Sequence, residues 1–335
     1  MTVVKEDVSR KITQPHPCVF CGKTNFYLLF AAPDFDTGEE SFQLTRCISC
    51  NLVRTEPILD NIELEKYYSL SYYGSGKAKF IGIAETLTYV FNFIRASSIL
   101  SHLRSRGFPA SPRPIVLDIG CGRGNLLKAF KRMKCECHGV ERTKFPAGND
   151  SQDICFHKGS LQDISFAESS FDAAVIWHVL EHVENPVAMI QEAHRVLRPE
   201  GVLAIAVPNF GSLQAKIFRE NWFHLDLPRH IHHFAPETLL RILNKSGFNV
   251  IRSHTSSIEQ NPFGFVQSLF NKIIPFSKPN RFYSLLKKTG RSSFSVSLLM
   301  WAAFALLIFP FALLEYLISG ALGRGATFVI YAKKC

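Results

Sequence analysis

Short apolar runs alternate with amphipathic segments along most of this chain. Residues Pro114 to Ile119 form an apolar run typical of a strand, and a glycine-rich turn and the helical pattern of residues 125–130 follow it. Toward the C-terminus the pattern predicts a helix over Ala235 to Lys245 and strands over Asn249 to His254 and Ala326 to Lys333. This alternation of strands and helices indicates an α/β fold.

The composition is that of a folded protein. Of 335 residues, 47% are hydrophobic and 20% are charged, which excludes a disordered or fibrous chain. Lys and Arg number 38 against 28 Asp and Glu, a net charge of +10, so nucleic acid and anionic membranes are candidate partners. Residues 1–14 lack the apolar core of a secretory signal, so we expect a cytoplasmic protein whose nine cysteines are thiols or metal ligands.

Two C-x2-C pairs near the N-terminus have the spacing of a four-cysteine zinc ribbon. Gly22 and Asn51, which follow the pairs, tolerate the left-handed backbone of such turns. A redox dithiol or unpaired buried thiols would not explain two matched pairs. Because sulfur fills every position, we expect a structural zinc ion. The acidic stretch between the pairs argues against nucleic acid binding. The predicted ligands are Cys18, Cys21, Cys47 and Cys50.

The turn after the first predicted strand has the sequence Gly-Cys-Gly-Arg-Gly over residues 120–124. The dinucleotide fingerprint G-x-G-x-x-G would require glycine at position 125, where this chain has Asn125. Asp118, just before the turn, would repel a pyrophosphate, but it suits a ligand with an ammonium and a sulfonium group. The turn therefore favours S-adenosylmethionine over a dinucleotide.

From this turn onward, most of the next 130 residues resemble the class I S-adenosylmethionine-dependent methyltransferases. The resemblance implies a Rossmann-like, mostly parallel sheet of seven strands with helices on both faces. It also implies that the glycine turn cradles the methionine end of the cofactor, that Glu141 takes the ribose hydroxyls, and that residues 159–163 lie at the adenine. Trp177 as plain core and Cys121 as a small loop residue are the alternatives. The implied cofactor residues are Asp118, Gly120, Cys121, Gly122, Gly124, Glu141, Leu161, Gln162, Trp177 and His178.

Residues 221–234 should roof the acceptor site, because ligands of open α/β sheets bind beyond the carboxyl ends of the strands. A hydroxyl acceptor must lose a proton, so His230 is the first candidate for a catalytic base and His233 the second, with Asp226 beside them. Fixing of the loop by a bond between His230 and Asp226, or a second metal site at His230, His232 and His233, are alternatives. A W-x-x-x-D-x-P-x-H-x-x-x-F pattern of a large methyltransferase subgroup is matched by Trp222, Asp226, Pro228, His230 and Phe234.

About 70 residues separate the last two predicted strands, where the family has a short hairpin. Residues 260–314 contain no Asp or Glu, and residues 294–314 contain no charge, a length that could span a bilayer. Because the last strand must return to the sheet, Pro310 and Gly320 favour a helical hairpin that dips into one leaflet, with the basic stretch on anionic headgroups. A buried helical pair, a dimer interface or a true span are the alternatives. The positive residues are Lys272, Lys278, Arg281, Lys287, Lys288 and Arg291.

These patterns predict three parts: a zinc-ribbon module over 1–55, a connecting helical segment over 56–108, and a methyltransferase domain over 109–335 with an insertion at about 260–322. The predicted function is methyl transfer to a hydroxyl of a lipid-linked or amphipathic acceptor, such as a glycolipid, a saccharide intermediate or a quinone precursor, at the inner face of the membrane. A soluble small-molecule or nucleotide-linked sugar acceptor and a non-catalytic cofactor-binding scaffold are the alternatives. Candidates for the acceptor pocket, or for packing of the connecting segment, are Tyr67, Tyr68, Tyr72 and Tyr73.

Overall fold

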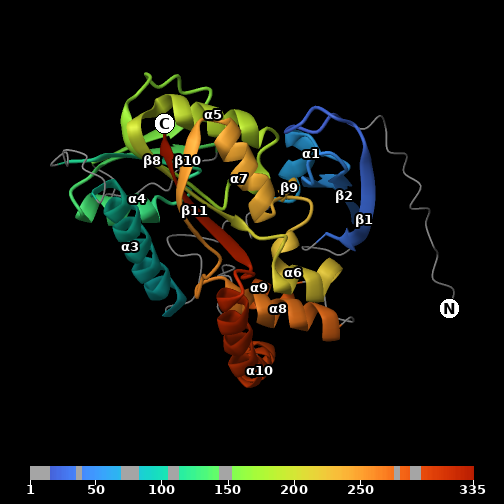
Figure 1. The fold of residues 1–335 in the computed structure, drawn as a ribbon. Coiled ribbons are helices and arrows are strands. Elements are labelled where there is room, and N and C mark those ends of the chain that lie inside the picture. The colour runs from blue at the N-terminus through green and yellow to red at the C-terminus, as the bar shows by residue number, and fades with distance from the viewer. Residues whose placement is uncertain are drawn as a thin grey trace.

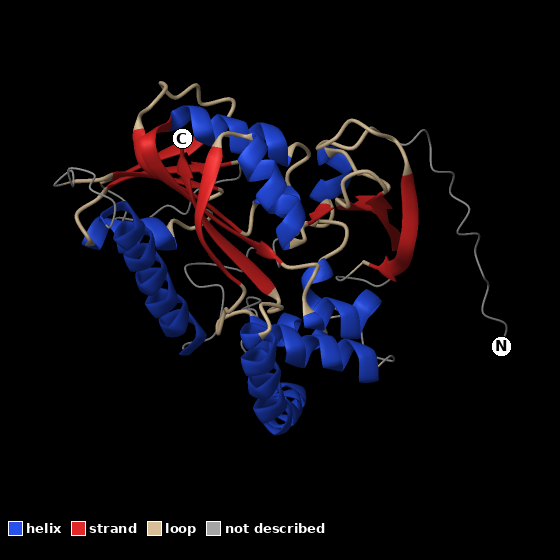
Figure 2. Cartoon of the chain, viewed as in Figure 1, coloured by secondary structure: helices blue, strands red, loops and turns tan. Residues whose placement is uncertain are grey.

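The computed structural model describes residues 16–34, 40–68, 83–104, 113–142, 153–274, 280–286 and 296–335. Figure 1 shows a large twisted sheet with helices on both faces, a smaller sheet beside it, and a helical lobe that projects below both. Figure 2 shows the same arrangement by element type. Several residues of the sequence predictions lie outside the described residues: Tyr72, Tyr73, Lys278, Lys287, Lys288 and Arg291.

The large sheet has seven strands in the order β10-β11-β8-β7-β4-β5-β6. Strands β4 to β8 run parallel to one another, whereas β11 is antiparallel to both β8 and β10. The Rossmann-like prediction is therefore confirmed. Strand order reverses on either side of β4, and such a switch point is where α/β sheets bind ligands. The strands are β4 (Ile115–Ile119), β5 (Glu136–Glu141), β6 (Ile154–Lys158), β7 (Phe171–Trp177), β8 (Leu197–Pro208), β10 (Phe248–His254) and β11 (Thr327–Lys334).

Alternate side chains of each strand enter two separate cores. Val116 of β4 packs in the core formed with α3 (Ile83–Arg104) and α4 (Asn125–Arg132), whereas Leu117 packs in the core formed with α5 (Pro186–Val196) and α7 (Pro236–Lys245). Both faces are apolar because helices cover both, as parallel sheets require. The two layers of helices leave the carboxyl ends of the strands open for a site.

The small sheet has the order β1-β2-β3-β9. Three of its strands come from the N-terminal part of the chain, and the fourth, β9 (His232–His233), comes from the predicted roof segment. In the pairing of β3 with β9, Val53 is opposite His233 and Arg54 is opposite His232. The roof is thus held by the N-terminal module. The other bounds are β1 (Phe26–Pro33), β2 (Ser41–Cys47), β3 (Val53–Glu56) and the following α1 (Asn61–Glu65).

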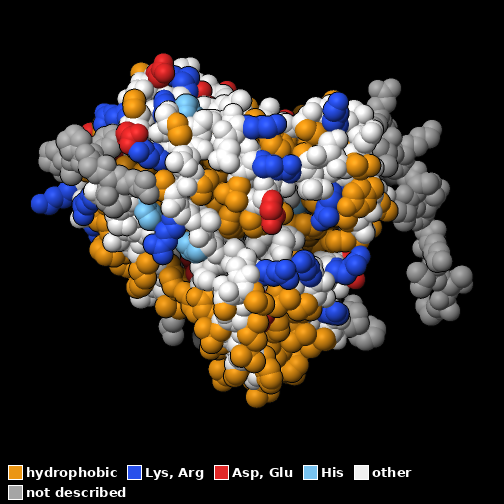
Figure 3. Space-filling view, in the orientation of Figure 1, with side chains coloured by type: hydrophobic (Ala, Val, Ile, Leu, Met, Phe, Trp, Pro, Cys, Tyr) orange, Lys and Arg blue, Asp and Glu red, His pale blue; other side chains and the backbone are white. Residues whose placement is uncertain are grey.

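The insertion contains α8 (Asn261–Ile273), α9 (Arg281–Leu286) and α10 (Val296–Ala321). α10 is one continuous helix with Pro310 inside it, so the expected helical hairpin is wrong. A proline removes one backbone donor and kinks a helix, but no turn residues flank this one to reverse the chain. Among the described residues, the stretch Leu299–Ala321 is the one helical segment long and apolar enough to cross a membrane, with a mean hydropathy of 2.0. Figure 3 shows its hydrophobic surface at the lower tip of the molecule.

Candidate functional site

The four N-terminal cysteines meet at one point. Their Sγ atoms all lie within 4.8 Å of one another, at 3.4 Å for Cys18 with Cys50 and 3.5 Å for Cys21 with Cys47. A tetrahedral zinc ion with bonds of about 2.3 Å would hold its sulfurs about 3.8 Å apart. Gly22 and Asn51 take the positive φ angles of 70° and 64° that close the two turns. The residues therefore fit a four-thiolate zinc ion.

The cysteine cluster is packed against the methyltransferase-like core. Cys18, Cys47 and Cys50 belong to the same apolar cluster as α5 and α7, and the Arg241 guanidinium of α7 donates to the carbonyl of Cys50. Through β3 the cluster is also continuous with the roof strand β9. A metal ion bound by the four cysteines would therefore also stabilise the position of the roof strand.

The glycine turn lies at the end of β4, as predicted. Gly120 has a φ of 73°, and a Cβ there would lie 2.4 Å from Cγ2 of Val179, so only glycine fits. The amide of Gly122 donates to Oε2 of Glu141 at 2.9 Å. Gly124 precedes the first residue of α4, so unpaired helical N–H groups face the turn. The turn after β4 and Glu141 at the end of β5 thus lie side by side.

Asp118 is buried beneath this turn, and burial raises the pKa of its carboxyl to about 7. The opposing influence on that pKa comes from Arg95 of α3. The guanidinium of Arg95 stacks over the ring of Trp177 at 3.9 Å and pairs with Glu259 at 2.8 Å. Sequence reasoning missed Arg95, because the pattern of polar and apolar residues in a helix does not show which arginine side chain is buried.

The remaining predicted cofactor residues occupy different surroundings. Leu161 is fully buried, whereas Gln162 beside it is exposed, in a turn closed by hydrogen bonds from Ser160 to Asp163. Cys121 is buried next to β5. His178 follows β7 with a φ of 54°. All of them lie beyond the carboxyl ends of β4 to β7. Their contacts with a cofactor stay a prediction.

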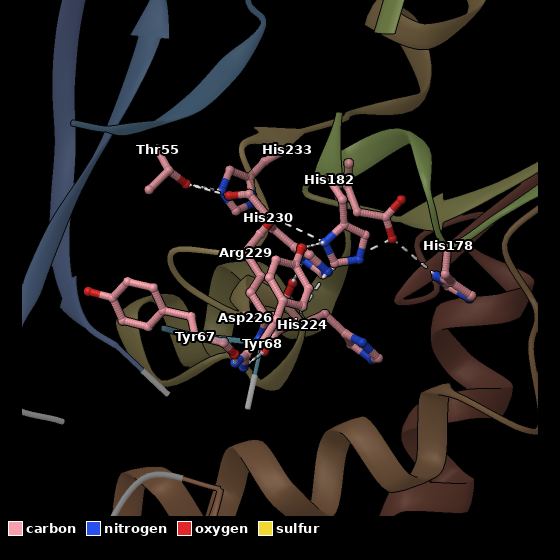
Figure 4. Close-up of polar contacts among 11 residues, drawn as sticks. Thr55, Tyr67, Tyr68, His178, His182, His224, Asp226, Arg229, His230 and His233 are labelled. Atoms are coloured by element: carbon pink, nitrogen blue, oxygen red, sulfur yellow. Dashed lines mark hydrogen bonds and ion pairs between the residues drawn. The ribbon is translucent and has the colours of Figure 1, made fainter. Parts of the chain in front are cut away.

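Histidines and a buried glutamate meet beneath the roof (Figure 4). Glu181, in the 3₁₀ turn Leu180–His182, is 1% exposed, and among the described residues neither of its carboxylate oxygens has a hydrogen-bond partner. Its Oε1 lies 3.4 Å from Nδ1 of His178 and 3.9 Å from Nε2 of His230. Burial raises the pKa of this carboxyl, but the neighbouring His178, His182 and His230 outweigh that effect and lower the pKa to about 2, so Glu181 is charged and attracts a cation. Sequence reasoning missed Glu181, although its place directly after a central strand was a usable signal.

Hydrogen bonds to backbone carbonyls fix which nitrogen is protonated in the two histidines next to this carboxylate. Nδ1 of His230 donates to the carbonyl of His224 at 2.9 Å, and Nδ1 of His182 donates to the carbonyl of Arg229 at 3.0 Å. A carbonyl oxygen only accepts, so in the neutral rings both Nε2 atoms lack a proton. Glu181, His182 and His230 could hold a metal ion, since their ligand atoms lie within 4.8 Å of one another. The cluster can accept a proton or bind a cation.

The three predicted catalytic residues Asp226, His233 and His230 are all engaged by neighbouring groups or affected by burial. Asp226 pairs with Arg229, with Nε at 3.0 Å from Oδ2, and this pairing holds the pKa of Asp226 below its usual value despite burial, which raises it. Thr55 donates its hydroxyl proton to the carbonyl of His230 at 2.6 Å, so Nε2 of His233, at 3.0 Å, must donate to the Thr55 oxygen. His233 thereby ties the roof to β3. Burial lowers the pKa of His230 to about 4, so its ring is neutral at pH 7.

Known proteins support this assignment of the fold. A family model described as a methyltransferase domain matches residues 87–253, which begin within the predicted connecting segment and include most of α3. The chain is 27% identical over 180 residues to a ubiquinone biosynthesis O-methyltransferase of Mesorhizobium japonicum, covering 48% of this chain and 72% of that protein. A protein of the same name from Cereibacter sphaeroides is 24% identical, with 41% of this chain and 60% of that protein covered. The match thus spans 60% to 72% of the length of these two relatives.

Solved structures of similar fold include a SAM-dependent methyltransferase from Archaeoglobus fulgidus, with 21% identity, a TM-score of 0.46, and coverage of 73% of this chain and 94% of that one. A second is the 1,6-didemethyltoxoflavin-N1-methyltransferase of Burkholderia thailandensis, with 15% identity, a TM-score of 0.46, and coverage of 90% and 99%. The family match and the seven-stranded sheet together identify the protein as an S-adenosylmethionine-dependent methyltransferase of class I.

Proposed function

We propose that this enzyme transfers the methyl group of S-adenosylmethionine to a hydroxyl of an amphipathic or lipid-linked small molecule. The observation that carries the choice of a hydroxyl is the buried carboxylate of Glu181, with Nε2 of His230 at 3.9 Å from it and His182 in the same cluster. Such a hydroxyl must lose its proton as it attacks, and this cluster can take it. The names of the relatives, ubiquinone biosynthesis O-methyltransferase, support an oxygen acceptor.

For the cofactor, we assign its ammonium group to the Asp118 carboxylate and its ribose hydroxyls to Glu141. Glu141 already accepts from the Gly122 amide, so its orientation is fixed before a ligand arrives. Arg95, buried over Trp177, is placed to meet the carboxylate of the methionine moiety. The glycine turn lets the backbone approach the ligand closely, and this geometry supplies most of the rate enhancement, since a sulfonium is already an activated methyl donor.

The proton acceptor is His230, with Glu181 stabilising the positive charge that the ring gains. Asp226 is engaged by Arg229 and His233 donates to Thr55, so both act in positioning the roof. A divalent cation held by Glu181, His182 and His230 is a second candidate for the same task, favoured by the close approach of one ligand atom from each of the three side chains. It would lower the pKa of a bound hydroxyl. Dependence of turnover on an added divalent cation, in enzyme that retains the zinc ion of the cysteine cluster, separates these two forms of the proposal.

The zinc ion at the cysteine cluster is proposed as structural, because four thiolates leave no open coordination position. Attachment to the cytoplasmic face of a membrane is proposed through α10, whose exposed apolar surface includes Leu306, Leu307 and Phe311. α10 would lie in one leaflet, since β11 directly after it returns to the large sheet. An amphipathic acceptor would then be available at the same surface.

A series of phenols tests the function. Purified enzyme, methyl-labelled S-adenosylmethionine and anionic vesicles are incubated with phenols that carry alkyl chains of increasing length. We expect labelled methyl ethers whose rate rises with chain length. Equal rates for short and long chains would favour a soluble acceptor. Binding of S-adenosylhomocysteine without any labelled product, from these phenols or from whole-cell extract, would favour the non-catalytic scaffold.

A further inference from the structure

A second apolar surface lies on α3, away from the insertion. Leu87, Val90 and Ile94 are 49%, 44% and 57% exposed, and their spacing of three and four residues places them in one stripe along the helix. The opposite side of the same helix is buried against the sheet through Ile99 and Leu103. The side chains of the stripe therefore do not contribute to the core. Residues 86–94 of the helix carry no charge.

This stripe and α10 lie on the same side of the molecule. The ion pair of Arg95 with Glu259 joins α3 to the loop that follows β10, and in the same loop Ser256 packs against Gly320 near the end of α10. Figure 1 shows both helices pointing toward the lower edge, beyond the carboxyl ends of the strands. Arg95 of α3 also stacks on Trp177 of the proposed cofactor site, so α3 adjoins that site.

The charges around α10 favour an anionic lipid surface as the partner. Figure 3 shows Lys and Arg side chains gathered in a band just above the hydrophobic tip. The charged residue within α10, Glu315, faces inward, where it accepts from Gln214 at 2.7 Å. Apolar side chains bordered by cations match the acyl and headgroup layers of an anionic lipid surface. The exposed cations on the elements packed about α10 are Lys216, Lys272, Arg281 and Arg324.

We propose that α3 and α10 form one two-part lipid-binding surface that frames the entrance of the active site, so that the enzyme takes its acceptor from the membrane on which it rests. This inference rests on the proposed function for the identity of the acceptor, but the surface itself does not depend on it. α10 provides insertion into the leaflet, and the stripe on α3 sets the orientation. With both helices engaged, the entrance faces the lipid and a tethered acceptor reaches it without crossing water.

Flotation with vesicles tests the surface. The full-length enzyme is mixed with phosphatidylglycerol and phosphatidylcholine vesicles, and the floated fraction is compared for wild type, Leu87→Glu/Val90→Glu and the milder Leu87→Ser/Val90→Ser. The matched control is Ile62→Glu, at an isoleucine 81% exposed on α1. Binding of S-adenosylhomocysteine reports folding of each variant.

We expect the α3 double glutamate variant to bind anionic vesicles about tenfold more weakly or worse, the serine variant to be intermediate, and the Ile62 variant to match wild type. Both α3 variants should keep affinity for S-adenosylhomocysteine. Wild-type flotation by both α3 variants would overturn the proposal, as would equal binding to vesicles without anionic lipid. Conversion of a dimer to a monomer by the α3 change, with flotation unaltered, would overturn it in favour of a second copy. Because flotation needs no turnover, failure of the methyl-transfer proposal is detected separately.

Discussion

Three carboxylates beside the carboxyl ends of adjacent strands differ in their surroundings. Asp118 is buried and burial raises its pKa, Glu141 accepts from two backbone amides, and Glu181 faces histidine rings. Environment, and not residue type, decides what each can do. We therefore assign an ammonium to Asp118, hydroxyls to Glu141 and the reacting proton to the cluster of Glu181.

Cofactor affinity should depend on pH through Asp118. Its pKa is raised to about 7 by burial, so the group is neutral below that pH and charged above it. An ammonium prefers the charged form, so affinity for S-adenosylhomocysteine should weaken up to about tenfold per pH unit below 7 and level off above it. Calorimetric titration between pH 5.5 and 8.5 measures this.

Asp118→Asn is the control for that titration. It should bind weakly with a flat pH profile, and it should also be more stable than wild type near pH 8, since the buried charge is gone. A wild-type profile that stays flat through pH 7 would contradict the assignment of the ammonium to Asp118.

Removal of the buried charge at Glu181 should abolish most turnover. Glu181→Gln keeps the size of the side chain, so we expect cofactor binding to be retained and kcat to fall about 100-fold or more. The matched change Glu184→Gln, three residues away in an accessible position, should leave kcat unaltered. Full activity of Glu181→Gln would exclude both the proton-acceptor and the cation form of the mechanism.

At the scale of elements, sequence predicted what local pattern determines. The strand, glycine turn and helix at residues 114–130 have local signals, and the structure places them as expected. By contrast, β9 joins the small sheet by pairing with a strand about 180 residues earlier, which no local pattern reveals. The hairpin expected from Pro310 and Gly320 is wrong, because both residues lie inside one continuous helix. Arg95 and Glu181 were missed because their inward positions depend on tertiary packing.

The pairing of β3 with β9 couples the cysteine cluster to the active site. Cys47→Ser should lose stoichiometric zinc by metal analysis, lower the melting temperature and reduce kcat together, because the roof loses its support. The control is Cys335→Ser, an exposed cysteine at the C-terminus. Retention of stoichiometric zinc by Cys47→Ser would refute the four-thiolate site.

Gly120→Ala should damage the glycine turn directly. The added methyl would meet Val179, and the positive φ would be strained. We expect cofactor affinity to fall at least about tenfold, with partial recovery in Gly120→Ala/Val179→Ala, measured by the same titration. Unchanged affinity in the single variant would show that the turn is not in the cofactor site.

At the scale of the whole molecule, three parts converge on one edge of the large sheet. The N-terminal module pairs with the roof through β9, the strands present the three carboxylates, and α3 is joined to the loop after β10 by the ion pair of Arg95 with Glu259. Under the proposed lipid-binding role of α3 and α10, the net positive charge and the apolar insertion would both serve attachment to a membrane that holds the acceptor.

The most direct test is to incubate the purified enzyme and methyl-labelled S-adenosylmethionine with cell extract, and then to separate lipid from aqueous products. We expect label in the lipid fraction for wild type, and none for Glu181→Gln although that variant still binds the cofactor. Label confined to the aqueous fraction would contradict the membrane-resident acceptor.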